Sequence, residues 1–188
     1  MTEDEIKNLI KSDTWMMQVL SAARELNLPD WMIGAGFVRN KVWDHLHGFK
    51  NHEVQTADID LIYFDPDNKE ELTEKDLDKK LAQIMDVKWS AKNQSRMHLK
   101  HKRTQPYINC VEALSEWVET PTCVAVRLEA DDSISLFAPH GIDDLVNYQG
   151  QIVFMTKDSA EKFAESYAKC QREHWGGAEC VVRWEILA

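Results

Sequence analysis

Two acidic residues interrupt the most regular strand pattern of the chain, at residues 57–64 (ADIDLIYF). Side chains alternate between the two faces of a strand, so Asp58, Asp60 and Ile62 share one face. Two carboxylates about 4 Å apart repel by roughly 4 kcal/mol at an effective dielectric of 20. A divalent cation between them would relieve that repulsion, and oxygen ligands alone favour Mg²⁺ or Mn²⁺ over zinc. The pattern therefore predicts a metal site made by Asp58 and Asp60.

A glycine turn precedes this strand in the sequence, at Gly34, Ala35 and Gly36. It follows the apolar run at residues 31–33 and precedes residues 37–47, whose apolar side chains have helical spacing. Glycines let backbone amides approach an anion closely, and the following helix offers its positive N-terminal end. The turn therefore predicts a phosphate site.

Four cationic or amide side chains are candidates for contacts with that phosphate or with a substrate. Arg39 lies in the first turns of the helix after the glycines, where it either reaches a phosphate or forms a surface ion pair. Lys92, Asn93 and Arg96 cluster at the end of a candidate strand over residues 86–92, and loops after strands often carry substrate contacts. We predict all four as phosphate or substrate contacts.

Helices and strands are interleaved along the chain. Helical patterns begin after Ser12-Asp13 and recur over 69–85, from Asn109, over 141–148 and from Asp158 to about His174. Two strands around a turn are predicted over 122–129 and 133–138. This order predicts an α+β fold with a short mixed β-sheet flanked by helices. We expect a single domain, residues 1–188, with a core of about 13–148 and a C-terminal helical extension of about 149–188.

The charge balance limits the partners. There are 32 Asp and Glu against 22 Lys and Arg, a formal net charge of −10, and residues 100–103 (KHKR) form the one compact basic run. Proteins that grip nucleic-acid backbones usually carry a basic face, so a small molecule or a protein is favoured as partner over a long nucleic acid. No apolar run approaches the roughly 20 residues of a membrane helix. The polar N-terminus is unlike an export signal, so we expect a cytoplasmic protein that does not contact membranes.

Five blocks of the sequence together resemble the signature of a bacterial family of nucleotidyltransferases, within the DNA polymerase beta-like superfamily. The blocks are residues 31–40 (WMIGAGFVRN), 42–44 (VWD), 58–65 (DIDLIYFD), 89–98 (WSAKNQSRMH) and 138–145 (APHGIDDL). They cover most of the chain from residue 31 to about residue 148. The resemblance also implies a short mixed sheet flanked by helices.

The resemblance implies that a nucleoside monophosphate is transferred from a Mg-NTP to an acceptor hydroxyl, with release of pyrophosphate. The Gly34-Ala35-Gly36 turn would hold the triphosphate. Asp58 and Asp60 would be the catalytic pair that binds Mg²⁺ or Mn²⁺. The four candidate contacts named above would then bind the nucleotide, whereas the acceptor and the preferred nucleotide are not implied.

Two departures from the family pattern support other interpretations. Ala35 stands where the family often has serine or glycine, and the candidate strand at residues 87–92 (VKWSAK) lacks the third carboxylate that active members usually supply. Acids that substitute for it in space are to be sought among Glu129, Asp131, Asp132, Asp143 and Asp144. The alternative is a non-catalytic nucleotide-binding or regulatory module of the same fold. A metal-dependent phosphohydrolase is a third interpretation, supported by the aspartate pair alone.

The seven tryptophans are expected mainly in the core. Trp43 and Trp89 are the two candidates for a pocket wall.

Overall fold

A five-stranded sheet lies at the centre of the computed structural model, which describes residues 1–48, 58–100, 103–147, 149–152 and 183–186. The described helices are α1 (Glu3–Lys11), α2 (Thr14–Glu25), α3 (Gly36–Leu46), α4 (Glu71–Ile84), α5 (Met97–Lys100), α6 (Cys110–Ser115) and α7 (Asp143–Val146), with 3₁₀ turns η2 (Gln94–Arg96) and η3 (Thr120–Thr122). The described strands are β1 (Met32–Gly34), β2 (Ile59–Tyr63), β3 (Trp89–Asn93), β4 (Ala125–Leu128), β5 (Ile134–Phe137), β6 (Gln149–Ile152) and β7 (Arg183–Ile186).

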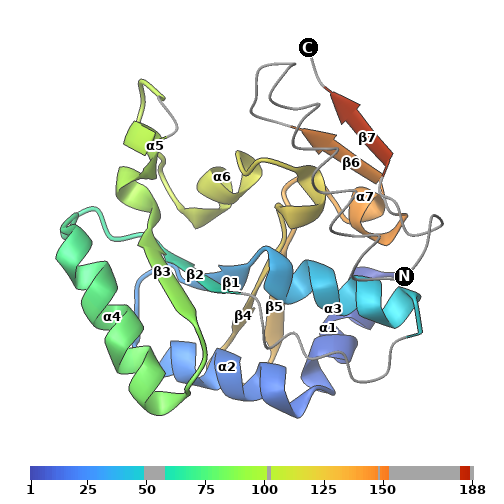
Figure 1. Ribbon diagram of the computed structural model, residues 1–188, viewed down its shortest axis with the longest axis horizontal. Helices are drawn as coiled ribbons and strands as arrows, with labels where there is room; N and C mark the ends of the chain where they lie inside the picture. Colours follow the sequence, from blue (N-terminus) through green and yellow to red (C-terminus); the bar gives the residue numbers. More distant parts are fainter. Residues whose placement is uncertain (49–57, 101–102, 148, 153–182, 187–188) are drawn as a thin grey trace.

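The sheet is mixed, with the strand order β3-β2-β1-β4-β5. β2 and β3 are parallel, whereas the β1–β2, β1–β4 and β4–β5 pairs are antiparallel. A parallel pair needs a crossover connection, and α4 supplies it and packs along β3 (Figure 1). A short mixed sheet flanked by helices confirms the predicted fold class.

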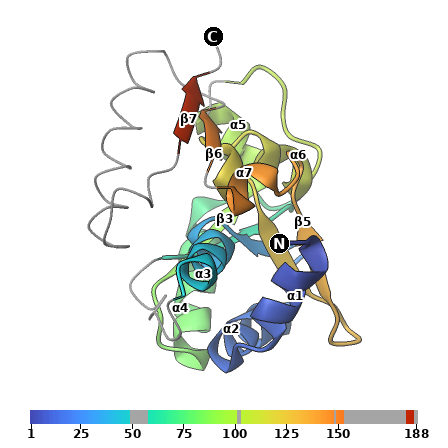
Figure 2. The same cartoon turned by 90° about the vertical axis from the view of Figure 1, so that its right-hand side faces the viewer.

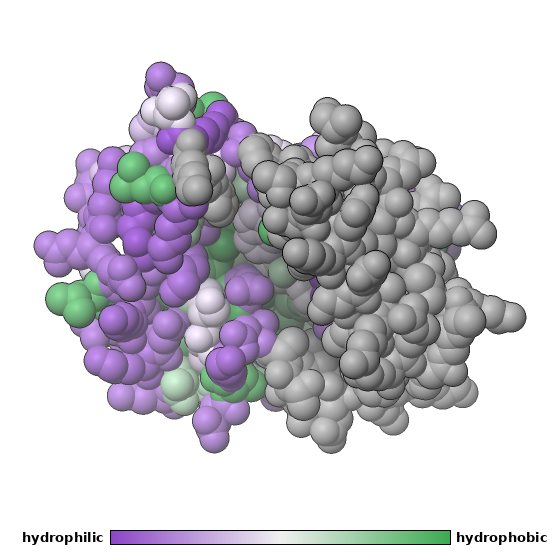
Figure 3. Space-filling view, turned by 45° about the horizontal axis from the view of Figure 1, so that its top comes forward, coloured by the Kyte–Doolittle hydropathy of each residue, from purple (hydrophilic) through white to green (hydrophobic). Residues whose placement is uncertain are grey.

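The alternation predicted for β2 separates two layers of hydrophobic core. Ile59, Leu61 and Tyr63 belong to the larger cluster, which α1, α2, α3 and α4 share on one side of the sheet (Figures 1 and 2). Ile62 belongs to a smaller cluster on the opposite face, where α6 packs. Asp60 shares the face of Ile62, so the acidic pair lies on the α6 side. Seen from above α5 and α6, the molecule is recessed beside a hydrophilic surface, with hydrophobic atoms inside the recess (Figure 3).

Helix α1 was not among the predicted elements. Thr2 and Glu5 form a capping box at its start, and Ile6 and Ile10 are fully buried against the core. The helices and strands that were predicted before residue 148 are all present, with shifted ends. The predicted strand at 122–129, for example, begins as the 3₁₀ turn η3 and becomes β4 only at Ala125.

Of the expected C-terminal helical extension, residues 149–188, the structure describes two short pieces. Both are strands, β6 and β7, which pair in parallel. The predicted helix from Asp158 to His174 lies outside the described residues, so it remains a prediction. In the part of the chain that the structure describes, no helix is long and apolar enough to cross a membrane.

Candidate active site

Asp58 and Asp60 lie at the start of β2 and differ in exposure. Asp58 is exposed, and its Oδ1 lies 2.6 Å from Nζ of Lys88. Asp60 is half-buried: burial and the neighbouring Asp58 charge raise its pKa to about 6, although a hydrogen bond with Ser90 acts in the opposite direction. Burial removes the water that would stabilise the charged carboxylate of Asp60. A bound cation would favour that charged form, because it would supply a nearby positive charge.

The glycine turn lies beside this pair. The β1–β2 register pairs Ile33 with Leu61, so the next residue along β1, Gly34, lies opposite Asp60. Ala35 then turns the chain into α3 with φ 54° and ψ −127°, a conformation that costs a non-glycine residue on the order of 1–3 kcal/mol. The first amides of a helix lack acceptors within it, and no side chain in the described parts of the chain caps α3.

The two glycines of the turn have different surroundings. A Cβ on Gly34 would lie 3.1 Å from the carbonyl oxygen of Val124 and 3.2 Å from Cη2 of Trp117, so the packing leaves no room for a side chain. A Cβ on Gly36 would meet its nearest neighbour, Nδ2 of Asn40, at 3.4 Å, which is ordinary contact. Internal packing therefore explains Gly34, whereas it does not explain Gly36.

Arg39 forms an ion pair, and this pair is largely buried rather than on the surface. Its Nη1 lies 2.7 Å from Oε1 of Glu119, and the two side chains are 14% and 3% exposed. Its guanidinium also lies 5.3 Å from the centre of the Trp43 ring. Arg39 still acts on Asp60, because its positive charge lowers the pKa of that carboxyl.

Arg96 and Lys92 both bind Glu74 of α4. Arg96 donates to both Glu74 oxygens, from Nε at 2.8 Å and from Nη2 at 2.7 Å, while Nζ of Lys92 lies 3.4 Å from Oε2. Burial acts to raise the pKa of Glu74, but the hydrogen bonds from Arg96 and from the Asn93 backbone outweigh it and lower that pKa. Lys92 is the more exposed of the two cations, and its charge also acts on Asp60.

Asn93 holds the loop after β2. Its side chain accepts hydrogen bonds from the N–H groups of Asp65 and Ser95 and donates to the carbonyl oxygens of Asp65 and Asn68. The residue is 1% exposed. The structure thus places Asn93 and Arg96 in an internal network, while Lys92 and Arg39, although paired with Glu74 and Glu119, also lower the pKa of Asp60 through their charge.

Helix α4 also closes the edge of the sheet at β3. The backbone N–H of Asn93 donates to Glu74 at 3.0 Å, and that of Ala91 donates to Asp78 at 2.7 Å. Glu74 and Asp78 are one helical turn apart, about 6 Å along the helix axis. Ala91 and Asn93 are two strand positions apart, about 6.6 Å. The two spacings match closely enough for one face of α4 to accept hydrogen bonds from both of these backbone N–H groups.

Strand β3 supplies no third carboxylate. It pairs Ser90 with Asp60 and Lys92 with Ile62, and Lys88 just before it binds Asp58. Four of the five acids considered as substitutes bind other side chains: Glu129 binds Arg127, Asp131 binds Ser133, Asp132 binds Arg24, and Asp144 binds Thr120. Among the described residues, no group of three or more His, Cys, Asp or Glu side chains could hold a metal ion.

Two carboxylates are nevertheless a donor set that suits Mg²⁺. That ion usually keeps several waters and is bound through one or two carboxylates together with substrate phosphates. Asp58 and Asp60 lie beside the turn at Gly34–Gly36. The residues present therefore fit a metal that arrives with a triphosphate, rather than a metal held by the protein alone.

The two tryptophans proposed as pocket walls are buried in the core. Trp43 is 1% exposed and donates from Nε1 to Leu145, and Trp89 is 7% exposed and donates to Met85. Trp117, in contrast, is half-buried and packs against Gly34 of the turn. No periodic pattern surrounds Trp117, so the sequence offered no signal for it.

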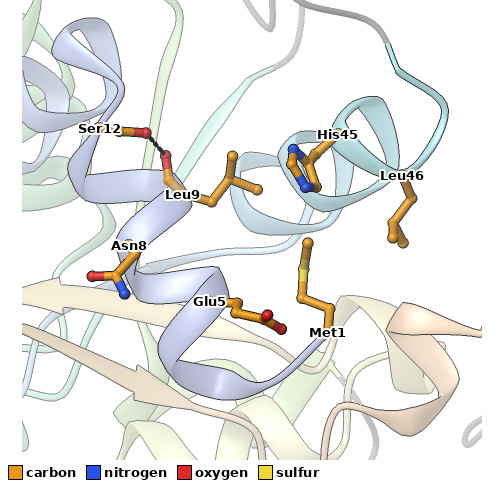
Figure 4. Close-up of a pocket in the computed structure, with 7 residues that line it drawn as sticks. All are labelled: Met1, Glu5, Asn8, Leu9, Ser12, His45 and Leu46. Carbon is orange, nitrogen blue, oxygen red and sulfur yellow. Dashed lines mark hydrogen bonds between the residues drawn. The ribbon is translucent and has the colours of Figure 1, made fainter.

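A separate cleft of about 540 Å³ lies between α1 and the end of α3 (Figure 4). Its lining residues are Met1, Glu5, Asn8, Leu9, Ser12, His45 and Leu46. Ser12 donates to the carbonyl oxygen of Leu9 at its rim. None of the predicted site residues lines this cleft.

The sequence matches the family model described as nucleotidyltransferase over residues 21–177, a range that contains the turn, the aspartate pair and Glu74. No curated protein matches the sequence closely enough to count as a relative. A solved structure whose description names a CCA-adding enzyme head domain is 27% identical, with a TM-score of 0.80, and covers 99% of this chain and 97% of that one.

Two solved tRNA-processing enzymes share the fold at lower identity. Their TM-scores are 0.53 and 0.50 at 16% and 17% identity, and the match covers 89% of this chain but only 43% and 44% of theirs. These likenesses concern the fold alone. Because the family match extends over well more than half of the sequence, the chain belongs to the nucleotidyltransferase family.

Proposed function

We propose that this protein transfers a nucleoside monophosphate from a Mg-NTP to an acceptor hydroxyl. The observation that carries the proposal is the register that sets Gly34 opposite Asp60. It brings the turn that leads into α3 close to the acidic pair at the start of β2. Metal-assisted phosphoryl chemistry requires this pairing, because one group must hold the phosphates and the other must hold the cation.

Each part of the site has a separate task. The amides at the start of α3 bind the triphosphate, and Gly36 lets it approach the backbone closely. Asp58 and Asp60 hold Mg²⁺ or Mn²⁺, which when bound neutralises phosphate charge and orients the reacting groups. Lys92 adds positive charge beside Asp60, whereas Arg39 is positioned by Glu119 and acts at longer range.

The reaction forms one bond and breaks one bond. The acceptor oxygen attacks the α-phosphorus, the bond from that phosphorus to the bridging oxygen breaks, and pyrophosphate leaves with the electron pair. The hydroxyl proton passes to solvent or to a basic group of the acceptor complex. Asn93 and Arg96 support this site through Glu74, which in turn binds Lys92.

The acceptor is proposed to be a small molecule or a protein, because the net charge of −10 disfavours a long polyanion. A tRNA is the competing acceptor, since the similar solved structure is described as the head domain of a CCA-adding enzyme. Labelling of tRNA or of a metabolite or protein fraction by an α-³²P-labelled NTP would distinguish these classes.

A non-catalytic nucleotide-binding or regulatory module is the second candidate. It is favoured by the neighbours of the aspartate pair on the β3 side, which are Lys88, Ser90 and Lys92 and include no acid. Such a protein would bind nucleotide without releasing pyrophosphate. Pyrophosphate release measured across an acceptor screen separates this candidate from the transferase.

The proposed site is tested by calorimetric titration of the four NTPs with and without Mg²⁺. The wild type is compared with Asp58→Ala, Asp60→Ala and Asp60→Asn, and with Asp67→Asn, an exposed residue of the loop after β2. We expect binding that depends on Mg²⁺ in the wild type and in Asp67→Asn and no such binding in the other variants. Wild-type affinity in the folded Asp58 and Asp60 variants would show that the metal site lies elsewhere.

A further inference from the structure

Trp117 is packed directly onto the first glycine of the turn. Its ring atom Cη2 lies 3.2 Å from the position that a Gly34 Cβ would occupy, and the Cβ of Ala125 lies 3.3 Å from the same point. Any side chain at residue 34 would displace the ring. The Trp117 ring thus packs against Gly34, on the face of the sheet that carries Asp60.

The position of Trp117 relative to Asp60 follows from the sheet. Residues directly opposite each other on antiparallel strands have Cα atoms about 4.5–5.5 Å apart, and Gly34 lies opposite Asp60. The Trp117 ring therefore stands one strand away from the proposed metal ligand. A nucleotide whose phosphates lie on the turn would therefore have this ring as a neighbour.

The ring is held in place and yet keeps exposed surface. Trp117 packs against the smaller core cluster, its backbone N–H donates to Leu114, and its carbonyl oxygen accepts a hydrogen bond from Cys123. It is nevertheless only half-buried, unlike Trp43 and Trp89. A fixed aromatic surface loses little conformational entropy when a flat ligand stacks on it.

We propose that Trp117 is the stacking platform for the base of the incoming nucleotide. This inference rests on the proposed function, since it takes the triphosphate to lie on the Gly34–Gly36 turn. Every nucleobase offers an aromatic face, so stacking on Trp117 tolerates all four bases. The site should therefore select for the presence of a base and discriminate weakly among bases.

The test compares nucleotide with bare polyphosphate. Mg-ATP, Mg-CTP and Mg-tripolyphosphate are titrated into the wild type, Trp117→Leu and Trp117→Phe. Leucine keeps apolar volume on Gly34 but removes the ring, whereas phenylalanine keeps a ring. Trp15→Ala is the control, because Trp15 is a half-buried tryptophan of α2 that contacts Phe37. Denaturant unfolding of each variant confirms that it is folded.

We expect Trp117→Leu to weaken Mg-ATP and Mg-CTP binding by about 5- to 150-fold, the range found when a stacking aromatic is removed. Tripolyphosphate affinity should stay unchanged. Trp117→Phe should recover most of the nucleotide affinity, and Trp15→Ala should match the wild type.

The outcomes separate this inference from the proposed function. If Trp117→Leu leaves nucleotide affinity unchanged, or weakens tripolyphosphate equally, the platform is disproved while the triphosphate site stands. The same holds if the wild type binds tripolyphosphate as tightly as ATP. If the wild type binds neither ligand, both the platform and the proposed function fail.

Discussion

Glu74 on α4 accepts hydrogen bonds from Arg96 through both carboxylate oxygens, at 2.8 and 2.7 Å, and it is 1% exposed. It also accepts the backbone N–H of Asn93 and lies 3.4 Å from Nζ of Lys92. A single helix residue thus ties together three residues at the end of β3. These are three of the four residues that the sequence marked as phosphate or substrate contacts, so their clustering has a structural cause independent of any ligand.

Glu74→Ala should destabilise the fold by about 3–5 kcal/mol, because the largely buried Arg96 would lose its two-pronged partner and keep only the exposed Glu71 at 3.8 Å. The matched control is Asp76→Ala on the same helix, where an exposed ion pair with Lys79 contributes about 0–1 kcal/mol. Urea unfolding measures both. Equal losses in the two variants would contradict the assignment of Glu74 as the centre of this network.

Asp60→Asn should stabilise the protein at neutral pH. Burial and the Asp58 charge raise the pKa of Asp60 to about 6, from an ordinary value of 3.8. The folded state therefore favours the protonated carboxyl, and the wild type loses stability as the pH rises from below 4 to above 6. The variant lacks this loss and should exceed the wild type by about 1–3 kcal/mol at pH 8.

The difference between Asp60→Asn and wild type should shrink toward zero below pH 4, where both side chains are neutral. Urea unfolding at pH 4, 6 and 8 tests this, and referring each value to the wild type at the same pH cancels other titrating groups. A difference in unfolding free energy that stays constant with pH would show that the charge of Asp60 is not what destabilises the wild type.

Ala35→Gly should raise the free energy of unfolding by about 1 kcal/mol, because glycine adopts the Ala35 conformation without steric cost. The opposite change is available at the other end of the same helix. Gly48 has φ 76°, and a methyl group added there would meet no atom of the described residues within 4 Å, so Gly48→Ala tests backbone strain. It should lose stability by about 1 kcal/mol. Thermal unfolding of both variants checks the opposite signs.

Gly36→Ala should keep the fold and weaken Mg-NTP binding. A methyl group there meets protein atoms only at 3.4 Å or beyond, but it would stand between the turn and a phosphate. Gly34→Ala should instead destabilise the protein by about 1–3 kcal/mol, because its methyl group would meet Val124 and Trp117 at 3.1 and 3.2 Å. Calorimetric binding together with urea unfolding separates the two effects. Full NTP affinity in Gly36→Ala would remove that residue from the phosphate site.

Local pattern was sufficient for much of the fold. The alternation in residues 57–64 correctly placed Asp60 and Ile62 on one face and Leu61 on the other, because strand geometry repeats every two residues. The glycine turn was also located correctly between β1 and α3. Both features depend on contacts between near neighbours in the sequence.

The arrangement of the site depends on contacts that no local pattern contains. Glu74 is one of several acids on α4, and only its packing against β3 distinguishes it from Asp76. Trp117 contacts Gly34 across more than eighty residues of sequence. For Arg39 the sequence left open a phosphate contact or a surface ion pair, whereas its buried pair with Glu119 follows from tertiary packing.

The carboxylates of Glu74 and Asp78 have a consequence for how these molecules associate with one another. They already accept the outward amides of β3, so another chain cannot add a strand there without first breaking those bonds. The opposite edge of the five-stranded sheet is β5, with four residues. A strand from another molecule could therefore pair with this sheet at β5 but not at β3, so continuous growth through both edges of the five-stranded sheet is blocked.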